Sequence, residues 1–416
     1  MRKGIYECVR CGYREVRDST EPMLEGSCPK CGGDMILVGY TDEAPEIHHE
    51  APTVPTSPPT EIEALLTQFY VLSFVESDGS VHVFEVKEIL EPNFEKVLTE
   101  LEKFGYWGAL KRRHGKVLLF VFPAGEVKPD NPWLPWLFLL ATILTTFFSG
   151  YVLAETYIAT LDYYSLPGLR NPYLIALSFS VSVMAIIGTH ELGHKIAATY
   201  HGVKATMPYF IPFPFSLIGT LGAVIRVKSP LPTRNAAIDL GVSGPIAGFL
   251  VAVPVTLIGL KMSIVVPPSL APHHGGGVYF GTNLLFELLM RSVLKTPSDY
   301  VVFLHPVAVA GWVGILVTFL NLIPVAQLDG GHVLRAFISE RAHRYITLGV
   351  AFLLFALGYF WQGWFIWGLL VLLIGMAGNP GALDEVSPIS KSRILLALTA
   401  LLIFLLTVTP RPLWST

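Results

Sequence analysis

The stretch Thr189-His190-Glu191-Leu192-Gly193-His194-Lys195 ends a long apolar segment that begins near Tyr173. As a helix, the segment 173–198 is long enough to cross a bilayer core of about 30 Å, which takes about 20 residues at 1.5 Å each. His190 and His194 are four residues apart, so on that helix both imidazoles leave the same face one turn apart. This spacing predicts two ligands of one zinc ion.

Glu191 follows the first of these histidines on the adjoining flank of the helix. From there its carboxylate can contact a water bound to the metal without binding the metal itself. Zinc lowers the pKa of such a water to about 7, and the glutamate would take its proton and pass it to a leaving amine. The motif therefore predicts metal-assisted hydrolysis of a peptide bond. Two histidines that only cap or pack a membrane helix would give the same pattern, so the surroundings must decide.

The surroundings favour a metal site. Ionisable side chains inside an apolar span are costly, and they usually have a functional partner there. A third ligand is present downstream, where the segment 321–331 has the sequence NLIPVAQLDGG. Asp329 in this segment is the predicted third ligand.

These two motifs resemble those of the site-2 protease family of intramembrane zinc metalloproteases. The resemblance depends on His190–His194, followed in a later apolar segment by Asn321, Pro324 and Leu328–Gly331. It covers roughly residues 133–377, and the combination of both motifs is far more specific than either one.

The resemblance implies a role for each matching residue. His190, His194 and Asp329 would bind one catalytic zinc ion. Glu191 would be the general base, and Asn321 would help to hold the substrate strand or the oxyanion. The chain would then be an intramembrane zinc metalloendopeptidase that cuts membrane-protein substrates in or near a transmembrane helix, with the lipid bilayer around it. No residue of either motif is missing, which argues against an inactive member.

The composition agrees with a membrane protein. The chain has 416 residues, of which 52% are hydrophobic and 15% charged, and its mean hydropathy is +0.53. These values predict a mainly α-helical polytopic membrane protein with small soluble attachments. The net charge of −3 gives no support for a nucleic-acid partner. We expect no secretory signal, because the first 40 residues are polar.

All four cysteines lie near the amino terminus, in two C-x-x-C pairs separated by 16 residues: Cys8, Cys11, Cys28 and Cys31. This spacing predicts a zinc ribbon at 1–40 with one structural zinc ion, in preference to two disulfides. Reduced thiolates would place the ribbon in the cytosol. We expect a structural or protein-docking role. A membrane-tethered DNA-binding regulator is the alternative, but the six basic and six acidic residues of 1–40 balance and give it no electrostatic support.

A linker at 41–60, rich in Pro and Glu, precedes a small soluble α+β domain at 61–128. Its pattern predicts a ββαββ unit with two hairpins and one helix, at 69–75, 81–86, 91–104, 106–110 and 116–122. No catalytic constellation is present in it. A regulatory or substrate-presenting module is therefore expected, followed by the membrane-embedded metalloprotease domain at 129–416.

Apolar segments from residue 133 onward predict about six to seven transmembrane helices. Their approximate bounds are 133–154, 173–199, 236–260, 303–322, 342–360, 363–378 and 393–409. A shorter amphipathic helix is predicted near 281–294.

The apolar stretch 204–228 does not fit a spanning helix, because Pro208, Pro212 and Pro214 interrupt it. A strand is predicted at 222–227. Irregular backbone at membrane depth is tolerated only against protein or a water-filled cavity. By resemblance to the family, this re-entrant β segment would offer an edge strand beside the metal, with which an unwound substrate can pair.

The distribution of Lys and Arg around the predicted spans indicates the orientation. Fifteen of these residues flank the spans on one side of the membrane and five on the other. By the positive-inside rule, the amino-terminal domains lie in the cytosol and the active site faces the cytosolic side of the cell membrane. The carboxyl terminus is predicted to lie on the opposite, non-cytosolic side of the membrane.

Three smaller features bear on the site. Gly241, Gly244 and Gly248 have the spacing of small residues that allow close helix approach, and this role is favoured over direct chemistry. Asp239 is a candidate for a polar group that hydrogen-bonds a metal ligand without binding the metal, or for a purely structural one. His332 could reach the site from the helical turn after Asp329, but the family motif gives it no ligand role.

A different class of function remains possible on the same residues. The cluster could bind zinc as cargo in a non-proteolytic membrane zinc-binding protein or transporter. A transporter should offer a polar path through several spans, and apart from Glu191 and Asp329 the predicted spans hold few acidic residues. The protease is therefore the favoured interpretation. The substrate and the oligomeric state do not follow from the sequence.

Overall fold

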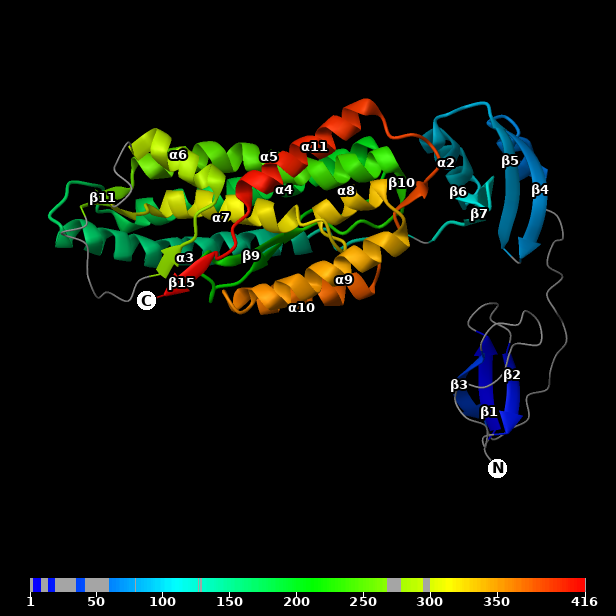
Figure 1. Cartoon of the computed structure of the whole chain (residues 1–416), viewed down its shortest axis with the longest axis horizontal. Helices are drawn as coiled ribbons and strands as arrows, with labels where there is room; N and C mark the ends of the chain where they lie inside the picture. Colours follow the sequence, from blue (N-terminus) through cyan, green and yellow to red (C-terminus); the bar gives the residue numbers. More distant parts are fainter. Residues whose placement is uncertain are drawn as a thin grey trace. The chain divides into compact units, whose positions relative to one another are not determined.

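The computed structural model describes nine ranges of the chain, which are 3–8, 14–18, 35–41, 60–78, 80–125, 127, 129–267, 278–294 and 300–415. The chain divides into two compact units, Met1–Pro55 and Thr56–Thr416 (Figure 1).

The first unit contains a three-stranded antiparallel sheet in the order β2-β1-β3. Its strands are β1 (Lys3–Cys8), β2 (Arg14–Asp18) and β3 (Met35–Thr41). Cys8 ends β1, and only its backbone is described. Cys11, Cys28 and Cys31 lie outside the described residues. The four-cysteine zinc site therefore stays a prediction.

The second unit begins with α1 (Thr60–Leu66), a short helix that the sequence pattern did not predict. The five elements expected after it are all present. They are β4 (Tyr70–Asp78), β5 (Val81–Ile89), α2 (Phe94–Lys103), β6 (Tyr106–Arg113) and β7 (Lys116–Pro123). Asn93 caps α2, and the helix buries Phe94, Val97 and Leu101. Strands β4 to β7 and helix α2 form the ββαββ unit.

The sheet of the ββαββ unit continues into strands from far downstream. Its order is β10-β14-β6-β7-β5-β4, in which β14 (Ala382–Asp384) runs parallel to β6 and β10 (Leu231–Thr233) runs parallel to β14. Strands of three residues are too short to show alternation in the sequence, so neither was predicted. Three separate parts of the chain therefore share one sheet.

Three helices in the described part of the chain are long and apolar enough to cross a membrane. They are α3 (Leu134–Tyr163), α4 (Pro172–Tyr200) and α5 (Arg234–Lys261). The Asn171 side chain accepts hydrogen bonds from two amides at the start of α4, and the Thr233 side chain accepts one, from Ala236, at the start of α5. Pro172 follows as the first residue of α4, where its missing N–H is not needed. The local sequence thus determines where both helices begin.

The other predicted spans are also helical but shorter. They form α7 (Pro306–Asn321), α9 (Glu340–Leu357), α10 (Gly363–Met376) and α11 (Lys391–Thr407), and the predicted amphipathic helix is α6 (Leu284–Leu294). A separate helix, α8 (Asp329–Phe337), follows α7 and was not predicted. Two small antiparallel pairs join β11 (Ile264–Val266) to β13 (Val301–Phe303) and β12 (Val278–Phe280) to β15 (Leu413–Ser415).

The centre of the helical part is formed by α4, α5 and α7, each packed against the other two. Helix α3 packs on α4, α8 packs on α5, and α9 pairs with α10 (Figure 1). The buried face of α7 is almost continuous, because helices surround it. A polar cluster on α4 that faces this centre is consequently shielded from lipid.

The stretch that prolines interrupt is a β-ribbon beside α3 and α4. It consists of β8 (Tyr209–Pro212) and β9 (Thr220–Val224), which pair only with each other in the described part of the chain. A strand was predicted at 222–227, and β9 begins two residues before that range and ends three residues before its end. Its partner β8 was missed because Pro208 precedes it and Pro212 is its last residue. Each strand keeps one unpaired edge.

Candidate active site

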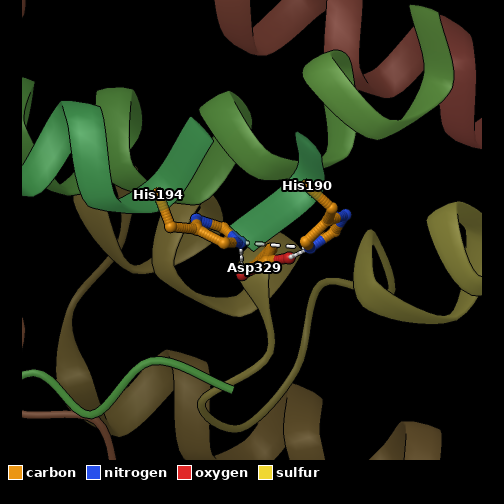
Figure 2. Close-up of side chains that lie close together, drawn as sticks. All are labelled: His190, His194 and Asp329. Carbon is orange, nitrogen blue, oxygen red and sulfur yellow. Dashed lines mark hydrogen bonds and ion pairs between the residues drawn. The ribbon is translucent and has the colours of Figure 1, made fainter. Parts of the chain in front are cut away.

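His190 and His194 lie on the inward face of α4, as the four-residue spacing predicted. The side chains are buried, with 4% and 7% of the residue surface exposed. Their Nε2 atoms are 3.1 Å apart. Two imidazole nitrogens from consecutive turns therefore point at the same small volume (Figure 2).

Asp329 completes a cluster with the two histidines. Its Oδ1 lies 3.3 Å from His194 Nε2, and its Oδ2 lies 3.4 Å from His190 Nε2 (Figure 2). The sequence placed Asp329 at the end of the span that contains Asn321. The structure places it instead as the first residue of α8, after a loop in which Ala326 has a φ of +51°. The loop turns the carboxylate back toward α4.

The ring of His194 is oriented by the neighbouring helix. Its Nδ1 lies 2.8 Å from the carbonyl oxygen of Leu240 in α5, an acceptor only, so Nδ1 carries the proton. In the neutral ring, Nε2 then presents a lone pair to the cluster. The Nδ1 atom of His190 is buried and has no hydrogen-bond partner among the described residues.

This donor set fits zinc. Donor atoms about 2.0–2.2 Å from a tetrahedral ion are separated by about 3.3–3.6 Å, close to the 3.1, 3.3 and 3.4 Å within this cluster. Two imidazoles and one carboxylate also match catalytic zinc sites, which keep a fourth position for water. Among the described residues, this is the group of histidine and acidic side chains whose ligand atoms converge within 4.8 Å.

Glu191 is beside the cluster and outside the ligand set. Only 6% of its surface is exposed. The backbone N–H of Ile225, directly after β9, lies close enough to its carboxylate to stabilise the negative charge. The β-ribbon therefore reaches the side chain that the sequence predicts to be the general base.

Asn321 also comes close to the ligands. It is the last residue of α7, and its Nδ2 lies 3.3 Å from His190 Nε2. The amide is thus at the side of the cluster that α7 faces. All five residues that the two motifs predicted for the site are brought together.

Residues 178–361 match the family described as peptidase family M50. This range includes both motifs. The chain contains a peptidase family M50 domain. The family predicted from the two motifs is therefore confirmed.

Relatives of the M50 domain include three plant proteins whose names describe probable zinc metalloproteases. The chain is 31% identical to "Probable zinc metalloprotease EGY1, chloroplastic" of Arabidopsis thaliana, over 56% of this chain and 43% of the relative. It is 32% identical to the Oryza sativa subsp. japonica protein of that name, over 58% and 41%. It is 26% identical to "Probable zinc metalloprotease EGY2, chloroplastic" of Arabidopsis thaliana, over 77% and 58%. The chain thus spans about half the length of these relatives. No solved structure matches it.

The glycines of α5 in the M50 domain pack directly on the candidate metal ligands. A Cβ atom at Gly244 would lie 2.1 Å from Nε2 of His194, and one at Gly248 would lie 3.1 Å from Cβ of His190. At Gly241 a Cβ atom would lie 2.7 Å from the backbone oxygen of Asp329. The sequence predicted close helix packing here, and the partners prove to be the candidate ligands.

Asp239 has a partner that the sequence did not suggest. Its Oδ2 lies 2.9 Å from Nε2 of His201, the residue that caps the end of α4. Arg393 of α11 donates to the same carboxylate at 2.8 Å. The other ring nitrogen of His201, Nδ1, lies 2.7 Å from Oε1 of Glu95 in α2. His201 thus lies between two carboxylates.

This pair of carboxylates makes the stability of the fold depend on pH. Burial of the His201 ring lowers its pKa, but the hydrogen bonds and charges of Asp239 and Glu95 outweigh burial and raise the pKa from 6.5 to about 9. Between these values the folded chain holds a proton that the unfolded chain has lost. The contribution is therefore complete below about pH 6.5 and disappears as the pH rises through about 9.

We expect the thermal unfolding temperature of the detergent-solubilised protein to fall over this pH range. The His201→Gln variant should show a smaller fall, because glutamine has no proton to lose. Arg393, the other partner of Asp239, stays charged over the whole range and therefore adds no pH dependence of its own. Equal pH dependence in the native chain and the variant would exclude His201 as the cause.

Among the described residues, neither His332 nor His305 is part of the cluster. His332 Nδ1 lies 3.4 Å from Nδ2 of Asn379, which agrees with its lack of a ligand role. His305 caps α7. His273 and His274 lie outside the described residues.

Proposed function

We propose that this chain is a membrane-embedded zinc endopeptidase that hydrolyses a peptide bond in or near a transmembrane helix of its substrate. The observation that carries the proposal is the convergence of His190, His194 and Asp329 beside Glu191, where α8 meets the long apolar helices α4 and α5. The names of the plant relatives support it.

The chemistry follows from the positions of the side chains. Bound zinc supplies Lewis acidity that polarises a carbonyl and acidifies a water molecule. Glu191 accepts the proton of that water, whose oxygen attacks the scissile carbonyl carbon. Glu191 then delivers the proton to the amide nitrogen as the C–N bond breaks. The Nδ2 group of Asn321, 3.3 Å from His190 Nε2, would donate a hydrogen bond to the oxyanion that forms or to the substrate strand.

The β8–β9 ribbon supports a place for the substrate. A peptide bond in a helix is protected by its hydrogen bonds, so a transmembrane substrate must unwind locally before it is cut. The unwound backbone then needs hydrogen-bond partners at membrane depth. The unpaired edge of the ribbon offers them, and the ribbon contacts Glu191 through Ile225.

The arrangement in the membrane is part of the proposal. Each of the seven predicted spans contains a helix, and three of these helices are long enough to cross by themselves. The excess of Lys and Arg supports a cytosolic amino terminus, with the zinc ribbon and the ββαββ unit on the cytosolic side of the cell membrane. The names of the plant relatives place those proteins in chloroplasts.

The test is cleavage of single-span reporter proteins by the detergent-purified chain. We expect a cut within or next to the apolar span, loss of cleavage when a chelator removes the metal, and recovery when zinc is returned. Recovery separates metal loss from denaturation. If a range of reporters stays intact while zinc remains bound, a zinc-binding or transport function replaces the protease.

A further inference from the structure

The ββαββ unit is linked by polar contacts to α4, the helix that carries two of the candidate zinc ligands. His201 at the end of α4 contacts Glu95 of α2 at 2.7 Å and Asp239 of α5 at 2.9 Å. The His201 side chain is only 5% exposed. A second contact, at the surface, joins Lys204 to Glu102 of α2. The contact between His201 and Glu95 is the stronger of the two, because its histidine is shielded from water.

A separate bridge links the same unit to α8, which carries the third candidate ligand. Lys111 of β6 lies 3.6 Å from Oε1 of Glu385, and Arg335 of α8 donates to that oxygen at 2.6 Å. The Arg335 side chain is 6% exposed and also donates to the backbone oxygens of Asn379 and Pro380. Glu385 is therefore the link between the sheet and α8.

Both bridges lie close to the candidate ligands along their helices. His201 is seven residues after His194, and Arg335 is six residues after Asp329, so each is about two turns away. An α-helix transmits a displacement over two turns with little loss, because its hydrogen bonds keep it rigid. A movement of the ββαββ unit thus changes the positions of α4 and α8 at the candidate zinc ligands.

The sheet makes the ββαββ unit a rigid connection between the two bridges. Strand β14 pairs with β6 at Asp384 and Leu110, one residue before Glu385 and Lys111 respectively. Strand β10 pairs with β14 and leads directly into α5 through the cap at Thr233. Thr233 also contacts Glu95 at 3.4 Å. The two bridges are therefore ends of one body.

We propose that the ββαββ unit is a clamp that fixes α4 against α8, with Glu95, His201, Glu385 and Arg335 as positioning residues for the zinc site. The inference rests on the proposed zinc site. The contacts of Asp329 with the two histidines, at 3.3 and 3.4 Å, are the only ones in the ligand set that depend on the distance between these two helices. The clamp acts on that distance.

The test measures zinc affinity in the full-length chain, by competition with a chromophoric chelator in detergent. Glu95→Gln and Glu385→Gln each remove the charge at the centre of one bridge. We expect each to weaken zinc binding about tenfold, as observed when groups that orient metal ligands are removed. The double variant should bind zinc almost as tightly as the single variant with the lower affinity, because opening either end already releases the clamp.

Matched controls remove ion pairs that stay within one helix. Glu100 pairs with Lys103 in α2, and Glu340 pairs with Arg344 in α9. Glu100→Gln and Glu340→Gln should keep native zinc affinity. Lys111→Gln removes a lysine that is 32% exposed and leaves two contacts of Glu385 in place, the ion pair with Arg335 and the 3.0 Å hydrogen bond from its backbone N–H to the Leu110 oxygen of β6. We expect it to weaken zinc binding less than Glu385→Gln does.

A second measurement separates positioning from general stability. Cobalt replaces zinc and reports ligand geometry through its visible absorption, which should shift in both bridge variants and in neither control. Variants that lose thermal stability but keep native zinc affinity and cobalt spectra would overturn the clamp. So would single losses that multiply in the double variant, because two independent supports behave in that way. If the native chain itself binds no zinc at this site, the proposed function fails instead.

Discussion

Replacing Glu191 with glutamine is expected to reduce reporter cleavage by about 10²–10⁴-fold while zinc stays bound. Glutamine has nearly the shape of glutamate but cannot accept the proton of the attacking water. Glu191 does not belong to the converging ligand set, so its replacement leaves all three zinc ligands in place. The measurement combines single-turnover cleavage with the zinc content of the purified variant.

Glu155 provides a matched control for this variant. It is a glutamate on the long apolar helix α3, and it is exposed on the outside of the described structure. Glu155→Gln should cleave the reporter at the native rate. If Glu191→Gln also cleaves at the native rate, another group is the base. If Glu191→Gln loses its zinc, Glu191 contributes to metal binding and its assigned role is wrong.

The local part of the site could be predicted from the sequence because helix geometry determines it. Residues four apart on a helix face the same side, so the convergence of His190 and His194 needs only that the segment be helical. Asp329 was different. It lies 135 residues after His194, so no spacing rule connects the two. It was predicted as the carboxylate of a downstream motif, and the resemblance to a known family supported that choice. The contacts at 3.3 and 3.4 Å come from the packing of α8 and α5, which leaves no periodic signal.

The connections between parts of the chain could not be predicted for the same reason. The contact of His201 with Glu95 joins residues 106 positions apart, and β10 and β14 have three residues each. Gly330 and Gly331 belong to the second motif. In the structure their missing side chains make room for the loop itself, since a Cβ atom at Gly330 would lie 2.1 Å from the carbonyl oxygen of Leu322.

The replacement of Gly244 by alanine is expected to damage the zinc site most among changes outside the ligands. The new Cβ atom would lie 2.1 Å from Nε2 of His194, the atom that faces the cluster. The ring cannot move aside, because it is buried and its Nδ1 is bonded to Leu240. Either α5 moves away from α4 or the ring turns out of the cluster. We expect zinc affinity to fall on the order of 100-fold and stability by about 1–3 kcal/mol.

Three alanine variants, two in α5 and one in α9, test the cause of this loss. At Gly248 the new Cβ atom would lie 3.1 Å from His190 Cβ, and at Gly349 of α9 it would meet nothing within 4 Å. Zinc affinity should therefore fall strongly in Gly244→Ala, slightly in Gly248→Ala and not at all in Gly349→Ala. Alanine at Gly349 should leave stability equal or raised, because it favours the helix. Equal zinc affinity in all three variants would show that the ligands do not depend on the space that the glycines of α5 leave. A loss in the predicted order would mean that the absence of a side chain at Gly244 is itself a requirement for metal binding.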